Sequence, residues 1–166
     1  PRACGREVGA ADVTGAALES ASGRGPGGIA CVPRRAAAEG VEALTASIRP
    51  AARINGVQLG AGDLTRELGI VRTKKGDEIA YARSRLVMAA RAAGIDAIDT
   101  PYADYRDEPG LLADIAYCKS IGMTAKTAIH PSQVRHVNAA FTPTKEELAG
   151  ARAIIPAYEE ALSKGI

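Results

Sequence analysis

Apolar and polar residues along the chain switch repeatedly between the short apolar runs of buried strands and the three-to-four-residue spacing of helices. The predicted strands lie at residues 28–32, 54–60, 95–99 and 125–129. The predicted helices lie at residues 36–48, 63–68 and 77–93, from Asp107 to Gly122, in a short segment from Pro131, and from Thr144 onward. Strands that alternate with helices predict an α/β fold with a parallel sheet and right-handed crossovers.

Capping residues mark where three of these helices begin. Asp107 suits an N-cap, and Pro131 suits the first position of a helix. Thr144 and Glu147 have the spacing of a capping box. Pro156 is expected to kink the last helix, because proline removes a backbone hydrogen bond. The helix from Asp107 to Gly122 carries an apolar stripe that we expect to be buried, at Leu111, Leu112, Ile115 and Cys118. The last helix carries one at Leu148, Ala151, Ile155, Tyr158 and Leu162.

Residues 1–28 differ in composition from the rest of the chain. They contain seven glycines and only three larger aliphatic residues, Val8, Val13 and Leu18. So little apolar surface cannot offset the entropy that is lost when a segment becomes ordered. We expect a loop, a weak helix near residues 7–20, or disorder, with a linker at 23–28. The α/β domain then covers residues 29–166.

Composition excludes several classes of protein. The 21 basic and 19 acidic residues nearly balance, and no basic run predicts binding to nucleic acid. No apolar stretch approaches the length of a membrane span. The widely spaced Cys4, Cys31 and Cys118 are typical of free thiols in a reducing compartment rather than of a disulfide frame or a zinc site. We therefore expect a soluble cytoplasmic domain.

Polar residues gather where the predicted strands end. Asp63 follows the second strand, Asp99 ends the third, and His130 follows the fourth. In a parallel α/β protein, the carboxyl ends of the strands form the edge where chemistry takes place. Asp63 also fits the N-cap of a helical turn. Lys126 lies within a strand, and without a sign of desolvation we predict no Schiff-base role for it. His136, on the helix after His130, is expected to be a solvated surface residue.

Three strand-end segments carry a resemblance to a known family: Gly60-Ala61-Gly62-Asp63-Leu64, Asp99-Thr100-Pro101-Tyr102-Ala103-Asp104 and Ile129-His130-Pro131-Ser132-Gln133. Over residues 53–164 the chain resembles the citrate lyase beta-subunit-like family, which also contains malyl-coenzyme A lyases. The resemblance implies the second half of a TIM-type (β/α)8 barrel, since a whole barrel needs roughly 250 residues. A half barrel leaves two strand edges unpaired, so we expect a fragment, a homo-oligomer or a chain with another partner.

The resemblance also implies site residues. It makes Asp63 a ligand of Mg²⁺, a hard cation that prefers oxygen ligands, and Gly62 a backbone contact to the substrate. Ile129 and His130 would lie at the mouth of the active site, where His130 either donates a hydrogen bond to the substrate or is satisfied by its local backbone. Ala36 stands where the family has a glutamate that is the second metal ligand, and the family's C-terminal lid has no counterpart in these residues. No catalytic residue is assigned.

The implied reaction is a Mg²⁺-dependent carbon–carbon cleavage. A 3-hydroxy-acyl thioester, carried on coenzyme A or acyl carrier protein, would be split into an acetyl-type thioester and a 2-oxo acid. Two alternatives stay open: a metal-dependent aldolase that acts on free pyruvate, and a non-catalytic scaffold that is truncated or depends on a partner. The missing glutamate leads us to expect that the site is incomplete in this chain.

Overall fold

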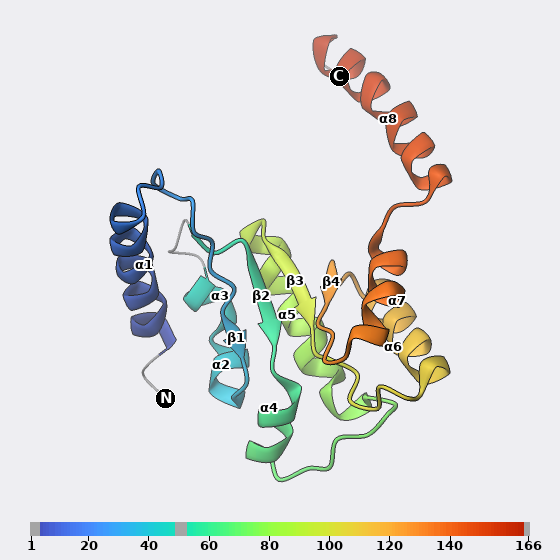
Figure 1. The fold of residues 1–166 in the computed structure, drawn as a ribbon. Coiled ribbons are helices and arrows are strands. Elements are labelled where there is room, and N and C mark those ends of the chain that lie inside the picture. The colour runs from blue at the N-terminus through green and yellow to red at the C-terminus, as the bar shows by residue number, and fades with distance from the viewer. Residues whose placement is uncertain (1–3, 49–52, 165–166) are drawn as a thin grey trace.

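Four parallel strands form one sheet in a computed structural model that describes residues 4–48 and 53–164. The strands are β1 (Arg34–Arg35), β2 (Gly56–Leu59), β3 (Asp96–Asp99) and β4 (Ala125–Lys126), and their order in space follows their order in the chain (Figure 1). Each strand pairs in parallel with its neighbour. The predicted α/β fold is confirmed, and strands that succeed one another without a reversal are the arrangement of a barrel segment.

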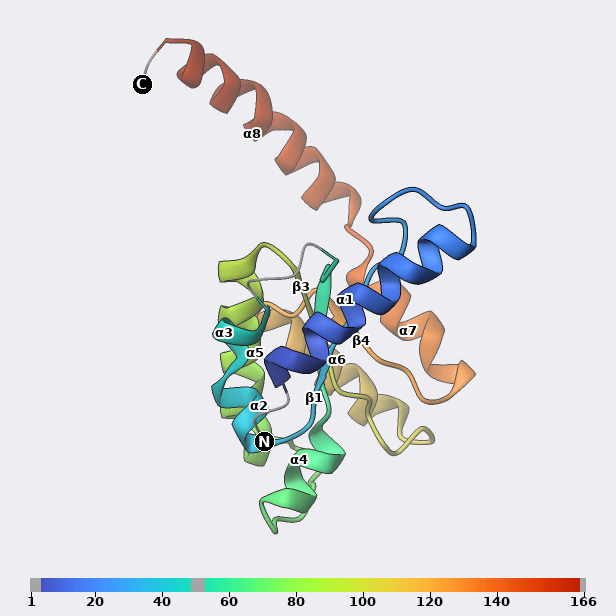
Figure 2. The ribbon, with the colours of Figure 1, turned by 90° about the vertical axis from the view of Figure 1, so that its left-hand side faces the viewer.

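Helices connect the strands and cover one face of the sheet. They are α1 (Cys4–Ala21), α2 (Ala38–Glu42), α3 (Leu44–Ile48), α4 (Ala61–Glu67), the 3₁₀ turn η1 (Asp77–Ile79), α5 (Ala80–Ala93), α6 (Glu108–Ser120), α7 (Pro131–Phe141) and α8 (Lys145–Ser163). Helix α5 packs on β2 and β3, α3 packs on α5, and α1 packs on α3. Helix α8 extends away from the rest of the chain in both views (Figures 1 and 2).

Alternation along the strands decides which side chains enter the core. In β2, Val57 and Leu59 are fully buried in one apolar cluster with Leu44 of α3 and Leu86 of α5. Gln58, between them, is half-buried and lies on the opposite face of the sheet. Each of these buried aliphatic side chains contributes roughly 1.5–3 kcal/mol to folding. The helix-covered face therefore holds the core, and the other face presents polar side chains.

The predicted first strand, 28–32, is misplaced. Cys31 makes only an isolated parallel bridge with Ile54, and the strand proper is formed by Arg34 and Arg35. Two adjacent arginines are tolerated because β1 is a short strand at the end of the sheet order. Arg34 points to the polar face, while Arg35 is buried and donates a hydrogen bond to the Ser47 hydroxyl.

Residues 4–21, for which the sequence left a loop, a weak helix or disorder open, form helix α1. Its last part is held by the buried Glu19, which pairs with Arg53. The same carboxylate accepts the backbone N–H groups of Gly27 and Ile29. One carboxylate thus ties the helix to the glycine-rich turn after it and to the chain before β2, which compensates for the scarcity of apolar residues.

Three predicted helix starts are confirmed. Asp107 accepts the Gly110 N–H at the start of α6, Pro131 is the first residue of α7, and Thr144 with Glu147 forms a capping box. The stripe of α6 is buried except for Leu112, which is 45% exposed and was wrongly expected to be inside. Helix α8 continues through Pro156 to its last turn. Within the described residues, no helix combines the length and the apolar character that crossing a bilayer would need.

Candidate functional site

The carboxyl ends of the strands bring the predicted site residues to one edge of the sheet. The face that the helices leave uncovered carries Gln58 of β2, whose amide donates a hydrogen bond to the Thr127 hydroxyl just after β4 at 2.7 Å. This contact reaches across β3, so the polar face is concave at this end. The loops that follow the four strands therefore surround a common edge, as they do in parallel barrels.

Asp63 lies in the first turn of α4, whose N-cap is Gly60. It therefore does not cap the helix itself. Its Oδ2 accepts a hydrogen bond from Arg34 at 2.9 Å and its Oδ1 accepts one from Arg66 at 2.8 Å. The Asp63 side chain is 38% exposed, so the two ion pairs are in contact with solvent. Both carboxylate oxygens are thus engaged by guanidinium groups from two different elements.

Ala36 lies directly beside the turn that leads to Asp63. A Cβ built on Gly60 would come within 2.7 Å of the Ala36 methyl and 3.2 Å of Arg34 Cγ. This close approach explains why residue 60 must be glycine. The segment beside the Asp63 turn, β1 and the residue after it, therefore supplies the Ala36 methyl group and the Arg34 side-chain stem to this contact, and no carboxylate.

Mg²⁺ does not fit the residues around Asp63 as they stand. The ion takes oxygen ligands and commonly one or two carboxylates, whereas here one carboxylate is present and both of its oxygens face arginines. In residues 4–48 and 53–164, no group of three or more histidine, cysteine, aspartate or glutamate side chains could hold a metal. We derive no chemical step through a metal in this chain.

Gly62, the predicted backbone contact, is exposed next to Asp63. A Cβ placed on Gly62 would meet nothing within 4 Å, so no neighbouring atom requires glycine at this position. The space above its backbone is open to a ligand.

His130 is fixed at the N-cap of α7. Its Nδ1 accepts the Ser132 backbone N–H at 3.2 Å and lies 2.8 Å from the Ser132 hydroxyl. Since Nδ1 is the acceptor, the neutral ring carries its proton on Nε2. The ring stacks on Tyr105 with centroids 4.5 Å apart. The two roles predicted for His130 are therefore compatible. The local backbone satisfies Nδ1, while Nε2 on the exposed ring remains free to donate a hydrogen bond to a substrate.

The loops after β3 and β4 are tied together next to His130. The Ile129 backbone N–H donates to the Gln133 side-chain oxygen at 2.9 Å, and the Gln133 amide donates to the Tyr102 carbonyl at 2.8 Å. The Ile129 side chain is itself exposed. The side chain of His136, nearly two turns beyond His130 on α7, was expected on the surface but is 17% exposed, and its Nε2 lies 3.5 Å from the Glu108 carboxylate.

A cavity of about 220 Å³ lies between the segment before η1 and the loop after β3. It is lined by Arg72, Thr73, Lys74, Tyr102, Ala103 and Asp104. None of the four predicted site residues is part of this lining. No local pattern in the sequence predicted this cavity, because its lining combines two separate segments of the chain. The Asp104 carboxylate pairs with the Lys74 ammonium at 2.8 Å.

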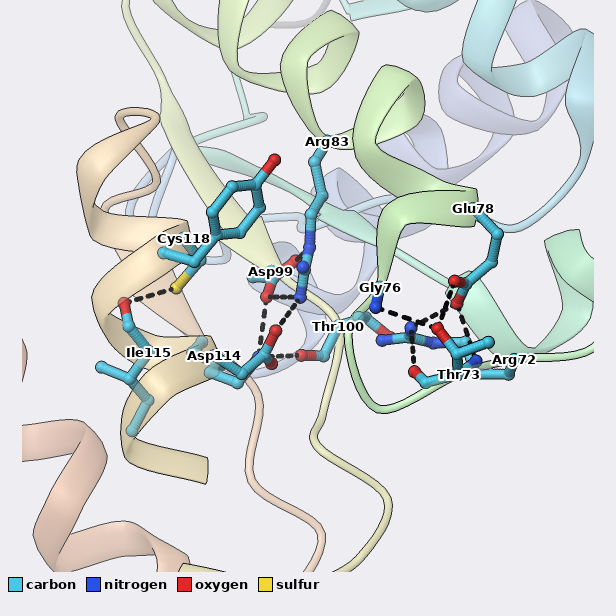
Figure 3. A network of polar contacts seen from close by, with 12 residues as sticks. Arg72, Thr73, Gly76, Glu78, Arg83, Asp99, Thr100, Asp114, Ile115 and Cys118 are labelled. Carbon is cyan, nitrogen blue, oxygen red and sulfur yellow. Dashed lines mark hydrogen bonds and ion pairs between the residues drawn. The ribbon is translucent and has the colours of Figure 1, made fainter. Parts of the chain in front are cut away.

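Two networks of charged groups hold the walls of this cavity, and Figure 3 shows the one around Glu78, together with the deeper network of Arg83, Asp99 and Asp114. Next to it, Glu78 accepts hydrogen bonds from Thr73 and Arg72. Burial alone would raise the pKa of Glu78, but these donors lower it to about 2. On the other side, the Lys74 ammonium, the Gly110 N–H and the Tyr102 hydroxyl together lower the pKa of Asp107 to about 2. Both carboxylates are therefore charged at neutral pH.

The deeper network lies between the sheet and the helices. Arg83 of α5 donates two hydrogen bonds to Asp99, at 2.9 and 2.8 Å, and one to Asp114 at 2.7 Å. Lys126 bonds both carboxylates and also the Thr100 carbonyl. These four side chains are fully or almost fully buried, and their charges cancel. Lys126 is thus desolvated, which the sequence did not indicate, but it has two counter-ions and its side chain points away from the polar face.

The network also encloses Cys118 of α6. Its thiol donates to the Ile115 carbonyl, and burial together with the negative charge of Asp99 raises its pKa to about 11. A thiol that stays protonated at neutral pH is a poor nucleophile. Cys118 is accordingly a free but unreactive cysteine, as is expected for a core position.

The fold and its polar strand ends define a parallel α/β protein of barrel type with its candidate chemistry at the carboxyl edge. A family model described as HpcH/HpaI aldolase/citrate lyase matches residues 30–131. The citrate lyase subunit beta of Escherichia coli strain K12 is 34% identical over 149 residues, which are 90% of this chain and 49% of that protein. The chain therefore belongs to the HpcH/HpaI aldolase/citrate lyase family, and the resemblance seen in the sequence is confirmed.

Further relatives give the same result. Mitochondrial citramalyl-CoA lyase of Rattus norvegicus is 39% identical over 114 residues, covering 68% of this chain and 34% of the relative. The citrate lyase beta subunit from M. tuberculosis, solved in complex with oxaloacetate and magnesium, superposes with a TM-score of 0.61 at 29% identity, over 69% of this chain and 53% of that one. The chain spans about half the length of the curated citrate lyase relatives that it matches.

Proposed function

We propose that the chain belongs to a carbon–carbon lyase that cleaves a 3-hydroxy-acyl thioester, on coenzyme A or acyl carrier protein, into an acetyl-type thioester and a 2-oxo acid. The observation that carries this proposal is that Gly62 and Asp63 follow β2 and His130 follows β4 at the carboxyl ends of parallel strands, within a matched family segment. The relatives named as citrate lyase and citramalyl-CoA lyase support this reaction class.

Within that reaction, His130 would act as a fixed hydrogen-bond donor. Because Nδ1 is held by Ser132, only Nε2–H is available to a thioester or carboxylate oxygen. A donor aimed at an oxygen where negative charge develops lowers the barrier of such a cleavage. The backbone at Gly62 would lie along the substrate. Magnesium is present in a solved relative, but it would need ligands beyond those that this chain provides around Asp63.

A second candidate is favoured by the state of Asp63. Its two ion pairs and the methyl group at Ala36 suit a scaffold without turnover, which would depend on a partner for any activity. The metal-dependent pyruvate aldolase remains the third candidate, and it differs from the lyase in making no demand for a thioester carrier.

Release of 2-oxo acid from malyl-CoA and citramalyl-CoA tests the three candidates. We expect weak, thioester-dependent release, at least about 100-fold slower than in a complete relative, because one missing electrostatic group commonly costs 10²–10³ in rate. His130→Asn retains an acceptor for the Ser132 N–H and removes the Nε2 donor, so it should slow release about tenfold. No release at all would favour the scaffold, and release from free 4-hydroxy-2-oxo acids alone would favour the aldolase.

We further propose that the chain forms a homo-oligomer through α8. The stripe Leu148, Ala151, Ile155, Tyr158 and Leu162 follows the alternating three-and-four spacing of a coiled-coil seam, and its large members are exposed. Arg152 and Glu159 lie seven residues apart on one flank of the stripe, so in an antiparallel pair Arg152 of each copy can meet Glu159 of the other, which favours self-association.

Light scattering during size-exclusion chromatography tests the contact. Ile155→Asp should shift the mass toward the monomer at micromolar concentration, because a charge would be buried in an apolar seam. Ala153→Asp, an exposed position off the stripe, should leave the mass unchanged. Equal masses for wild type and Ile155→Asp would remove α8 as the interface.

A further inference from the structure

We propose that Arg34 is the built-in counter-cation of Asp63: its guanidinium occupies the place that a divalent cation would take, so the chain binds no Mg²⁺ at Asp63. Removing Arg34 and placing a glutamate at position 36 would then turn the same place into a metal site. The proposal does not depend on the lyase reaction, and it can fail or succeed separately from it.

The first support is the saturation of the carboxylate. Arg34 approaches Oδ2 at 2.9 Å and Arg66 approaches Oδ1 at 2.8 Å. A magnesium ion would have to come within about 2.0–2.1 Å of one of these oxygens. At that distance it would share the oxygen with a positive group, and the like charges would repel. An incoming cation must therefore displace a guanidinium.

The second support is the difference between the two arginines. Arg66 is 80% exposed and lies three residues from Asp63 on the same short helix, so it can swing into solvent at little cost. Arg34 is less exposed, at 56%, and comes from the adjacent strand, where its Cγ lies 3.2 Å from the Cβ position of Gly60. Since the backbone of β1 pairs with β2 at Gln58, the root of the Arg34 side chain is fixed beside Asp63. Arg34 is the cation that blocks the site.

The third support is the place of Ala36. Residues 34 and 36 lie two apart along one extended segment, so they share the polar face of the sheet. The Ala36 methyl touches Gly60, three residues before Asp63, and Ala36 is only half-buried. A glutamate at position 36 would start next to the Asp63 turn and would not have to bury its charge. Glu67, also nearby, already accepts the Ala38 N–H at 3.2 Å.

Metal titrations of purified chain variants test the proposal. Mn²⁺, followed by electron paramagnetic resonance, replaces Mg²⁺ as the probe, and calorimetry with Mg²⁺ repeats the measurement. We expect no saturable site in the wild type below about 10 mM metal. Arg34→Gln combined with Ala36→Glu should bind one ion at least about 100-fold more tightly, and adding Asp63→Asn should abolish that binding. Two carboxylates are within the number that Mg²⁺ takes from a protein.

Matched variants separate the effect of Arg34 from that of net charge. Arg66→Gln with Ala36→Glu has the same formal charge as the first variant but retains Arg34, and it should stay without a site. Arg34→Gln alone, which makes the smallest change to the fold, should gain weak binding. A wild-type site that Asp63→Asn removes would overturn the proposal. So would a folded Arg34→Gln/Ala36→Glu protein, verified by circular dichroism, that binds no better than the wild type.

Discussion

Lys126→Met is expected to destabilise the fold by about 3–5 kcal/mol, because it removes one cation from a buried group of four charges. Lys126 is buried and bonds Asp99, Asp114 and the Thr100 carbonyl. Methionine fills a similar volume, so the loss would come from the carboxylate charge left uncompensated and from the unsatisfied carbonyl. Denaturation by urea, followed by circular dichroism, measures the free energy of unfolding.

Two comparisons make this result specific to the network. Lys119→Met removes a half-exposed lysine from the neighbouring helix and should change stability by less than about 1 kcal/mol. Adding Asp114→Asn to Lys126→Met restores charge balance, so the double variant should be more stable than the single one. If the double variant loses as much free energy of unfolding as Lys126→Met and Asp114→Asn lose together when made singly, the four charges do not act as a unit.

The loss of stability in Lys126→Met should also depend on pH. Burial alone would raise the pKa of Asp114, but Lys126 and Arg83 lower it below its ordinary value. A carboxylate whose pKa is lowered by folding stabilises the folded state at pH values above its ordinary pKa of about 3.9. This stabilisation is lost as the pH falls through the pKa of the folded state. The difference between wild type and Lys126→Met should therefore be greatest near neutral pH and shrink below about pH 4.

The sequence predicted most of the α/β domain because its signals there are local. Asp107 and Thr144 mark helix starts that depend only on hydrogen bonds within a few residues. The prediction of the first strand was wrong because the pairing of this strand is not local. Arg34 and Arg35 form a strand through contacts with residues 58–60. Apolar periodicity cannot reveal a strand of two arginines at the end of a sheet.

The site was predicted in part for the same reason. The position of Asp63 after a strand could be read from the chain, and it lies at the carboxyl edge as expected. Its partner Arg34 is 29 residues away, so no local pattern showed that the carboxylate would be engaged. The burial of Lys126 could likewise not be predicted from the sequence, because its counter-ions come from two other elements. Spacing locates a charged residue on an edge, but tertiary contacts decide its chemistry.

Gly110→Ala is expected to destabilise the chain by about 1–2 kcal/mol, although alanine is normally the better helix former by roughly 1 kcal/mol. A Cβ at position 110 would lie 2.1 Å from the Tyr102 hydroxyl oxygen and 2.5 Å from Asp107 Oδ2. Tyr102 is buried and Asp107 caps α6, so neither can move without losing its hydrogen bonds. Overpacking of this kind costs about 1–3 kcal/mol, which exceeds the gain in helix propensity. Thermal unfolding measures the outcome.

The matched control is Gly62→Ala in helix α4, where an added Cβ meets no atom within 4 Å. The same chemical change should there be neutral or slightly stabilising. A second readout follows the cap itself. When the methyl group displaces Asp107 from the Gly110 N–H, the pKa of Asp107 should rise from about 2 toward its ordinary value, as NMR titration would detect. An unchanged pKa with unchanged stability would show that the loop after β3 yields to the methyl group, and that the wall of the cavity is not held by this contact.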